Sequence, residues 1–184
     1  MNKLFNVSAI LKFQVMVIAI SSLILIIGYE SKAQNKEGLK KEIEPHVMAA
    51  NQIDAGRYLS IIAGCNDCHT EGYLQAEGNI PEEDWFAGSS LGWQGPWGTT
   101  YPSNLRLIVQ DNTEEDWVSI LHEREDLPPM PWMNVNQMSE KDAKAIYHYI
   151  KSLGPKGDYV PDALDPGVEP ETPYLSMMPL NLPE

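Results

Sequence analysis

The residues best placed to do chemistry are two cysteines and a histidine within five consecutive positions, Cys65, Cys68 and His69. Two thiols at this spacing can form thioether bonds with the two vinyl groups of one haem, and the imidazole that follows can bind its iron. The chain has no other cysteine. The motif therefore predicts one covalent haem c, held by Cys65 and Cys68, with His69 as an iron ligand.

Closely spaced cysteines also occur in two other kinds of site. A redox-active dithiol of the thioredoxin kind follows a strand, whereas the residues before Cys65 have the apolar spacing of a helix. A structural zinc site needs a fourth ligand besides Cys65, Cys68 and His69, and the sequence offers none at zinc-finger spacing. Haem attachment is therefore the favoured interpretation, with dithiol chemistry and zinc binding as the alternatives.

A helix is expected to present this motif. Apolar residues three or four apart predict a helix over residues 47–63 that ends at Gly64, directly before Cys65. Residues 70–112 are rich in Gly, Pro and Trp and lack a sustained apolar period, so we expect a long loop there, with one helical turn near residues 82–86. A loop of this length is unusual unless it wraps around something.

Two more helices are predicted after this loop, each opened by a capping-box pattern. The first begins after Thr113 and is expected to run to about Glu123. The second begins after Ser139 and has apolar residues at helical spacing up to Leu153. Gly154 and the proline after it end this last helix.

The N-terminal region is typical of an export signal. Lys3 and Lys12 precede an uncharged apolar run, which a small-residue pattern ending at Ala33 follows. Residues 1–33 are therefore predicted to be a cleaved signal peptide, with an uncleaved membrane anchor as the alternative. The expected location is the periplasm, either in solution or anchored by this segment.

The remaining chain divides into three parts. Residues 34–45 are charged, lack an apolar period and are expected to be a flexible spacer. Residues 46–154 are expected to form the one compact domain. Residues 155–184 are rich in proline and should form an extended tail, either draped on the domain or loose.

The strongly acidic composition restricts the possible partners. The formal net charge of the chain is −13. Such a surface repels nucleic acid and would be attracted to a basic patch on a partner protein. Carboxylates and hydroxyls occur only as scattered residues, and no Gly-rich phosphate loop follows a strand, so the sequence shows no catalytic apparatus.

Several of these features together resemble the class I cytochrome c family. They are the helix that contains Gly56, the Cys-x-x-Cys-His-Thr segment, a Met-Pro pair and the capped last helix. The resemblance covers roughly residues 47–154. It implies an all-α, cytochrome c-like domain that wraps one covalent haem and carries electrons by cycling its iron between the ferrous and ferric states.

A narrower resemblance concerns the middle of the chain. The segment from Gly95 to Leu105, followed by a Met-Pro-Trp sequence that begins at Met130, is similar to the haem domains of bacterial dehydrogenase-associated cytochrome subunits. Those subunits often carry several haems, whereas this chain has one attachment motif.

The family resemblance implies a methionine as the second iron ligand, which raises the reduction potential relative to two histidines. Met130 is the best match, because prolines on both sides hold its backbone stiffly. Met133 is the nearest competitor, and a histidine or an open iron position are further alternatives. Methionine is more often a core residue than a ligand. The other histidines are expected to be poor ligands: His46 precedes the domain, His122 is expected to pair with an acid at the surface, and His148 to be solvated.

A few further residues are singled out. The resemblance implies that Gly56 lets the first and last helices cross closely, with Tyr147 or Tyr149 packed over it. Aromatic and cationic residues in the middle of the chain are candidates to line the haem edge or to bond its propionates, although such residues are equally often plain core. These candidates are Trp97, Tyr101 and Arg106.

Three functions fit this sequence. The first is a carrier that moves electrons between a dehydrogenase and an oxidase or reductase. The second is a fixed electron-accepting subunit of a dehydrogenase complex, with the Pro-rich tail as a docking element. The third is a haem protein with an open iron position that binds a gas or performs peroxidase chemistry. A ligand set of His69 and Met130 leaves no free iron position and favours electron transfer.

Overall fold

The computed structural model of the protein describes residues 46–179. The predicted signal or anchor at residues 1–33 and the spacer at residues 34–45 lie outside the described residues, as do residues 180–184 of the tail. The described part contains six α-helices, one short 3-10 helix and one sheet of three strands. None of its helices is long and apolar enough to cross a membrane.

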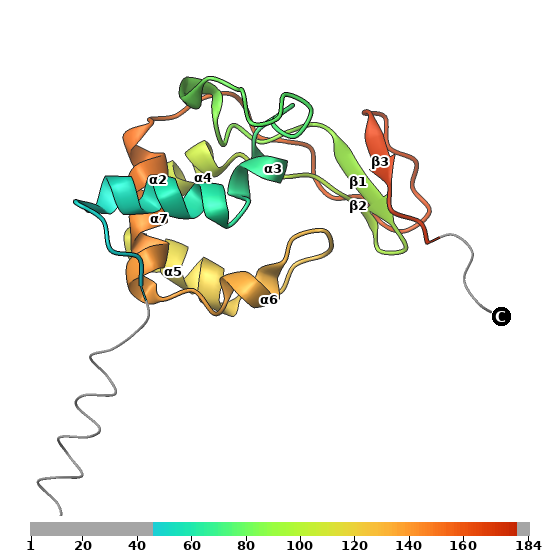
Figure 1. Cartoon of the computed structure of the whole chain (residues 1–184). Coiled ribbons are helices and arrows are strands. Elements are labelled where there is room, and N and C mark those ends of the chain that lie inside the picture. The colour runs from blue at the N-terminus through green and yellow to red at the C-terminus, as the bar shows by residue number, and fades with distance from the viewer. Residues whose placement is uncertain (1–45, 180–184) are drawn as a thin grey trace, which may run out of the picture. The chain divides into compact units, whose positions relative to one another are not determined.

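Helices α2 (Gln52–Ile62) and α7 (Glu140–Ser152) cross at the centre of the helical region (Figure 1). They approach closely at Gly56, where an added Cβ would lie 2.0 Å from the main-chain oxygen of Ala145 and 2.7 Å from Cβ of Tyr149. This confirms the close crossing expected at Gly56 and identifies Tyr149 as the tyrosine that packs over it.

The first helix is shorter than the sequence predicted. It begins at Gln52 because the side chain of Asn51 caps it, with Oδ1 accepting from the backbone N–H of Asp54 at 2.9 Å. Val47 lies in the extended segment before this cap, and its N–H donates to the Asp142 carboxylate of α7 at 2.9 Å. The prediction of a helix from residue 47 was wrong because a local cap outweighs the apolar spacing that precedes it.

The later capped helices agree with the predictions. Helix α5 (Glu114–Glu123) opens on a reciprocal capping box between Thr113 and Asp116. Helix α7 opens with Ser139 accepting from the N–H of Asp142 at 3.1 Å. The four-residue helix α6 (Trp132–Val135) lies between them. Residues from all the longer helices form one core, which includes Leu59, Val109, Trp117, Ile146, Tyr149 and Ile150.

Residues 70–112 are more structured than the predicted long loop. They contain a 3-10 helix η1 (Glu82–Asp84), which matches the expected helical turn, and the unpredicted helix α4 (Leu105–Asp111). Helix α4 has only seven residues, and Asn104 caps it by accepting from the N–H of Leu107 at 3.2 Å. The sequence analysis missed α4 because so short an apolar run shows no helical period.

The same segment forms most of a sheet, so the expectation of an all-α fold was incomplete. Strand β1 (Gly92–Gly95) pairs antiparallel with β2 (Gly98–Thr100) and parallel with β3 (Tyr174–Ser176), giving the order β2-β1-β3. The register places Trp93 opposite both Thr100 and Leu175. Strands of three or four residues are too short to show an alternation of apolar and polar residues, and no local sequence pattern predicts which strands pair.

The Pro-rich segment after α7 runs along this sheet (Figure 1). Thr99 and Leu164 exchange two backbone hydrogen bonds of 3.0 and 2.8 Å. Gly98 has a φ of +103°, and a Cβ at this position would lie 2.0 Å from the carbonyl oxygen of Leu164. Strand β3 then covers one edge of β1, with all three of its residues exposed. The fold is therefore a helical domain with a small sheet that the tail completes.

Candidate haem site

Helix α3 (Cys65–His69) carries the whole predicted attachment motif. Ala63 and Gly64 separate it from α2, so the motif follows directly on a helix as predicted. Figure 1 shows α3 between the α2–α7 crossing and the sheet. Its five residues place the two thiols and the imidazole within about one and a half helical turns.

The imidazole of His69 is held in the form that can bind a metal. Its Nδ1–H donates to the main-chain oxygen of Ser103 at 2.7 Å, which fixes the tautomer and leaves the Nε2 lone pair free. Burial lowers the pKa of His69, with the Ser103 hydrogen bond acting in the opposite direction. The ring is therefore neutral at pH 7, as an iron ligand must be.

The two thiols are free and half-buried. Burial raises the pKa of Cys65 to about 11, and burial likewise raises the pKa of Cys68. Redox-active dithiols instead have lowered pKa values, because the thiolate is the reacting form. No group of three or more His, Cys, Asp or Glu side chains within residues 46–179 is placed to bind a metal ion. Both alternatives to haem attachment are therefore disfavoured.

A buried hydrogen-bond network fixes α3 to the segment that follows it. The hydroxyl of Thr70 donates to Oδ1 of Asn66 at 2.6 Å and accepts from the N–H of Phe86 at 2.8 Å. The N–H of Gly88 donates to the His69 carbonyl oxygen at 2.9 Å. Sequence reasoning did not identify these residues or Ser103 as supports, since three of the four contacts use main-chain atoms that any residue provides.

Met130 lies in the loop between α5 and α6, and its side chain is half-buried. The loop is tied to β2, since the hydroxyl of Thr100 donates to the carbonyl oxygen of Pro128 at 2.8 Å. Charges of the same loop act on His69: Arg124 lowers its pKa and Asp126 raises it. The loop that carries Met130 and the helix that carries His69 are therefore close in space.

Arg106 is not available to a haem. It is buried, and its guanidinium donates to main-chain carbonyl oxygens on both sides: those of Glu83 and Trp85 at 3.2 and 3.3 Å, and those of Leu153 and Gly154. The residue instead fastens the end of α7 to the segment that follows η1. Its proposed place at the haem edge was wrong, because its guanidinium nitrogens are already engaged by carbonyls.

The two aromatic candidates for the haem edge, Trp97 and Tyr101, differ in their hydrogen bonding. The indole Nε1 of Trp97 is buried and has no hydrogen-bond partner in the part of the chain that the structure describes. The hydroxyl of Tyr101 accepts from Thr172 of the tail at 3.0 Å. An unpartnered buried donor is unusual. Trp97 is therefore the better candidate for a donor to a bound group.

The other histidines have structural partners. His122 Nε2 lies 2.9 Å from the main-chain oxygen of Met138, so its hydrogen-bond partner is a carbonyl and not the acid that the sequence suggested. His148 pairs with Glu114 of α5 and is only partly exposed. His46 begins the described part of the chain.

Comparison with known proteins decides the class of the site. Residues 53–154, more than half of the chain, match the family Cytochrome c. The chain belongs to the cytochrome c family. Proteins of this family bind haem c covalently through its vinyl groups, and their function is haem-mediated electron transfer. The resemblance seen in the sequence is thereby confirmed, and haem c with its iron is the cofactor.

One relative of this cytochrome is the fructose dehydrogenase cytochrome subunit of Gluconobacter japonicus. The two are 26% identical over 144 residues, which is 72% of this chain and 26% of the relative. The match thus covers about a quarter of that subunit's length. No solved structure matches the chain.

The residues of this cytochrome fit a covalent haem. Two free thiols stand beside an imidazole whose Nε2 lone pair is unused. The buried indole N–H of Trp97 lacks an acceptor, which a haem propionate would supply. Within residues 46–179, the His69 ring forms its hydrogen bond through Nδ1, which leaves Nε2 for the iron.

Proposed function

We propose that this protein is an exported single-haem cytochrome c that transfers electrons, with thioether links at Cys65 and Cys68 and with His69 and Met130 as axial ligands of the iron. The observation that carries the proposal is the bond from His69 Nδ1–H to Ser103, which orients a neutral imidazole beside two free thiols. The haem supplies one-electron exchange at its iron.

The chain's own residues hold and orient this group. Ser103 and the network of Thr70, Asn66 and Phe86 keep the His69 ring and α3 in one position. A fixed ligand geometry keeps the coordination the same in both oxidation states, so little reorganisation accompanies electron transfer. The side chains thus tune the iron and make or break no substrate bond.

Three features support Met130 over Met133. Met130 is half-buried and flanked by prolines, in a loop that the Thr100–Pro128 hydrogen bond anchors. The side chain of Asn136 donates to the carbonyl oxygen of Arg124 at 3.3 Å and fastens the other end of this loop. Met133 lies on α6 with 55% of its surface exposed. A ligand has to stay at one distance from the iron, which suits the anchored loop.

A pair of variants tests the ligand set. In the holoprotein, Met130→Leu should abolish the weak sulfur-to-iron absorption band of the oxidised form, admit cyanide or carbon monoxide, and lower the potential within the roughly 0.8 V range that axial ligands span. Met133→Leu is the matched control and should leave spectrum and potential unchanged. Loss of the band in Met133→Leu alone would contradict the assignment of Met130. Ready binding of cyanide or carbon monoxide by the unmodified protein would also contradict it.

The place of the protein in the cell is part of the proposal. The expected signal at residues 1–33 supports export to the periplasm, where haem is attached to such motifs. N-terminal sequencing of the protein from a periplasmic fraction should begin after Ala33. A start at residue 1 in a membrane fraction would instead identify an anchored form.

A second candidate function is an electron-accepting subunit of a dehydrogenase complex. The similarity to a cytochrome subunit of fructose dehydrogenase favours it. In that case the protein should copurify with a large dehydrogenase subunit at fixed stoichiometry and be reduced when that enzyme's substrate is added. A monomer that elutes alone from a gentle extract would support the freely diffusing carrier.

A further inference from the structure

An open groove lies between α3 and the sheet. Its walls include Cys68 of α3, Leu74 and Leu91 of the connecting segments, Trp93 of β1 and Leu175 of β3. We propose that this groove, with the acidic residues around it, is the surface on which a basic redox partner protein docks to exchange electrons. The inference rests on the proposed function, because it assumes that haem is attached at Cys68.

The groove is the right place for electron exchange. Cys68 is one of the two proposed attachment points and forms part of the groove wall. A partner seated there would contact the residues that carry the covalent link to the cofactor.

The centre of this surface is apolar. Leu74 exposes 52% of its surface and Leu175 exposes 42%, and both line the groove. Single exposed apolar residues are ordinary, but residues that gather around one groove are typical of a contact surface. Strand β3 brings Leu175 beside Trp93, although the two are far apart in the sequence.

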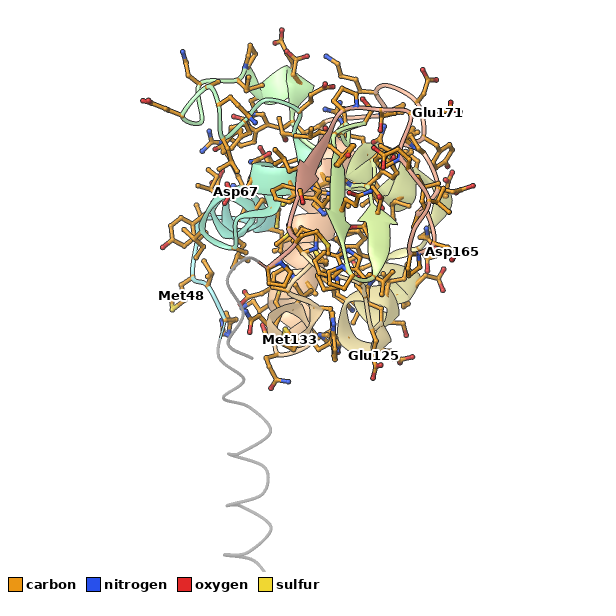
Figure 2. All side chains as sticks on the ribbon, turned by 90° about the vertical axis from the view of Figure 1, so that its right-hand side faces the viewer. Met48, Asp67, Glu125, Met133, Asp165 and Glu171 are labelled. Atoms are coloured by element: carbon orange, nitrogen blue, oxygen red, sulfur yellow. The ribbon has the colours of Figure 1, made fainter. Side chains whose placement is uncertain are left out.

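The charged side chains that line the groove are both acidic. The sequence has no Lys or Arg between Tyr58 and Leu105, and none after Gly157. Asp67 and Glu71 line the groove itself. Figure 2 looks onto this side of the domain and shows Asp67 on one side of the strands and Asp165 and Glu171 on the other.

Cations are concentrated elsewhere. Lys141, Lys144 and Lys151 belong to α7, and Lys156 follows it. Two acids between Tyr58 and Leu105 are paired with cations: Glu82 with Arg57, and Asp84 with Lys156. Neither of these acids lines the groove. An apolar centre with an acidic border complements a partner whose own contact surface is apolar with a basic border.

The test measures electron transfer from the reduced holoprotein to a strongly basic monohaem cytochrome by stopped-flow absorbance. Three single variants are compared with the parent protein at low and high salt: Glu71→Lys and Leu175→Ser in the groove, and Glu115→Lys on α5. Glu115 is exposed, and its variant has the same net charge as Glu71→Lys. The potential of each variant is measured so that rates are compared at equal driving force.

Glu71→Lys should slow the low-salt reaction about five- to tenfold, with the difference shrinking at high salt as charges are screened. Leu175→Ser should slow it by a similar factor at both salt concentrations. Glu115→Lys should change it less than about twofold. Equal effects of the two charge reversals, or no effect of either groove variant, would overturn this docking surface. Failure of the parent protein to contain covalent haem would instead overturn the proposed function itself.

Discussion

Two of the described glycines lie so close to another part of the backbone that a side chain would not fit, and they join very different regions. A Cβ on Gly56 or on Gly98 would lie 2.0 Å from a main-chain oxygen, that of Ala145 in the first case and that of Leu164 in the second. Gly56 joins two helices in the middle of the core. Gly98 joins a short strand to the tail at the edge of the sheet.

The comparison separates the helical region, which should provide most of the stability, from the sheet and tail, which form an exposed surface. Around Gly56 lie buried residues such as Leu59, Tyr149 and Ile150. The contact at Gly98 instead leads to β3, which is exposed along its whole length. The helical region should therefore decide whether the protein folds and binds haem, whereas the sheet and tail should decide mainly what the finished protein contacts.

The largest effect is expected from Gly56→Ala. The added methyl group has no space between α2 and α7, so the helices must separate and the free energy of unfolding should fall by about 3 kcal/mol or more. Chemical denaturation followed by circular dichroism would measure this loss, together with the yield of covalent haem. A stability close to that of the parent protein would show that the two helices can move apart at little cost.

Arg106→Met is expected to rank next. The substitution removes the donors for four main-chain carbonyl oxygens, two at the end of α7 and two at η1 and the residue after it, so we expect a loss of about 2 to 3 kcal/mol. The same denaturation experiment measures it. Arg57→Met is the control: it breaks an exposed ion pair with Glu82 and should cost less than about 1 kcal/mol. Equal losses in the two variants would mean that the buried carbonyls find other donors.

Gly98→Ala tests the other side of the comparison. It forces a side chain into a positive φ and against the tail, but both can be relieved if the tail lifts away. We expect about 1 to 2 kcal/mol of lost stability and faster proteolysis within residues 157–179, with an unchanged haem spectrum. Loss of haem binding as severe as in Gly56→Ala would break the proposed distinction between the two regions.

The smallest effect is expected from Tyr149→Phe. This change keeps the ring in the core and removes only the hydroxyl, which donates to the Glu82 carboxylate at 2.7 Å. The expected loss is about 1 kcal/mol, measured by thermal unfolding. A loss near that of Gly56→Ala would show that this hydrogen bond, and not the close packing of α2 against α7 at Gly56, holds the two helices together.

Much of the site could be predicted from the sequence because its signals are local. The attachment motif lies within five residues, and the caps at Thr113 and Ser139 act within one helical turn. Gly56 was also identified, through the family resemblance. The axial roles of His69 and Met130 remain predictions.

The sequence by itself determined the class of cofactor and the helices at both ends of the domain, because thiol spacing and caps are properties of neighbouring residues. Only the tertiary structure decided that Arg106 binds carbonyls, that the Ser103 carbonyl orients His69, and that β3 lies beside β1. These contacts join residues 21 to 82 positions apart and depend on main-chain atoms. Main-chain donors and acceptors are the same in every residue, so their pairing leaves no local pattern to read.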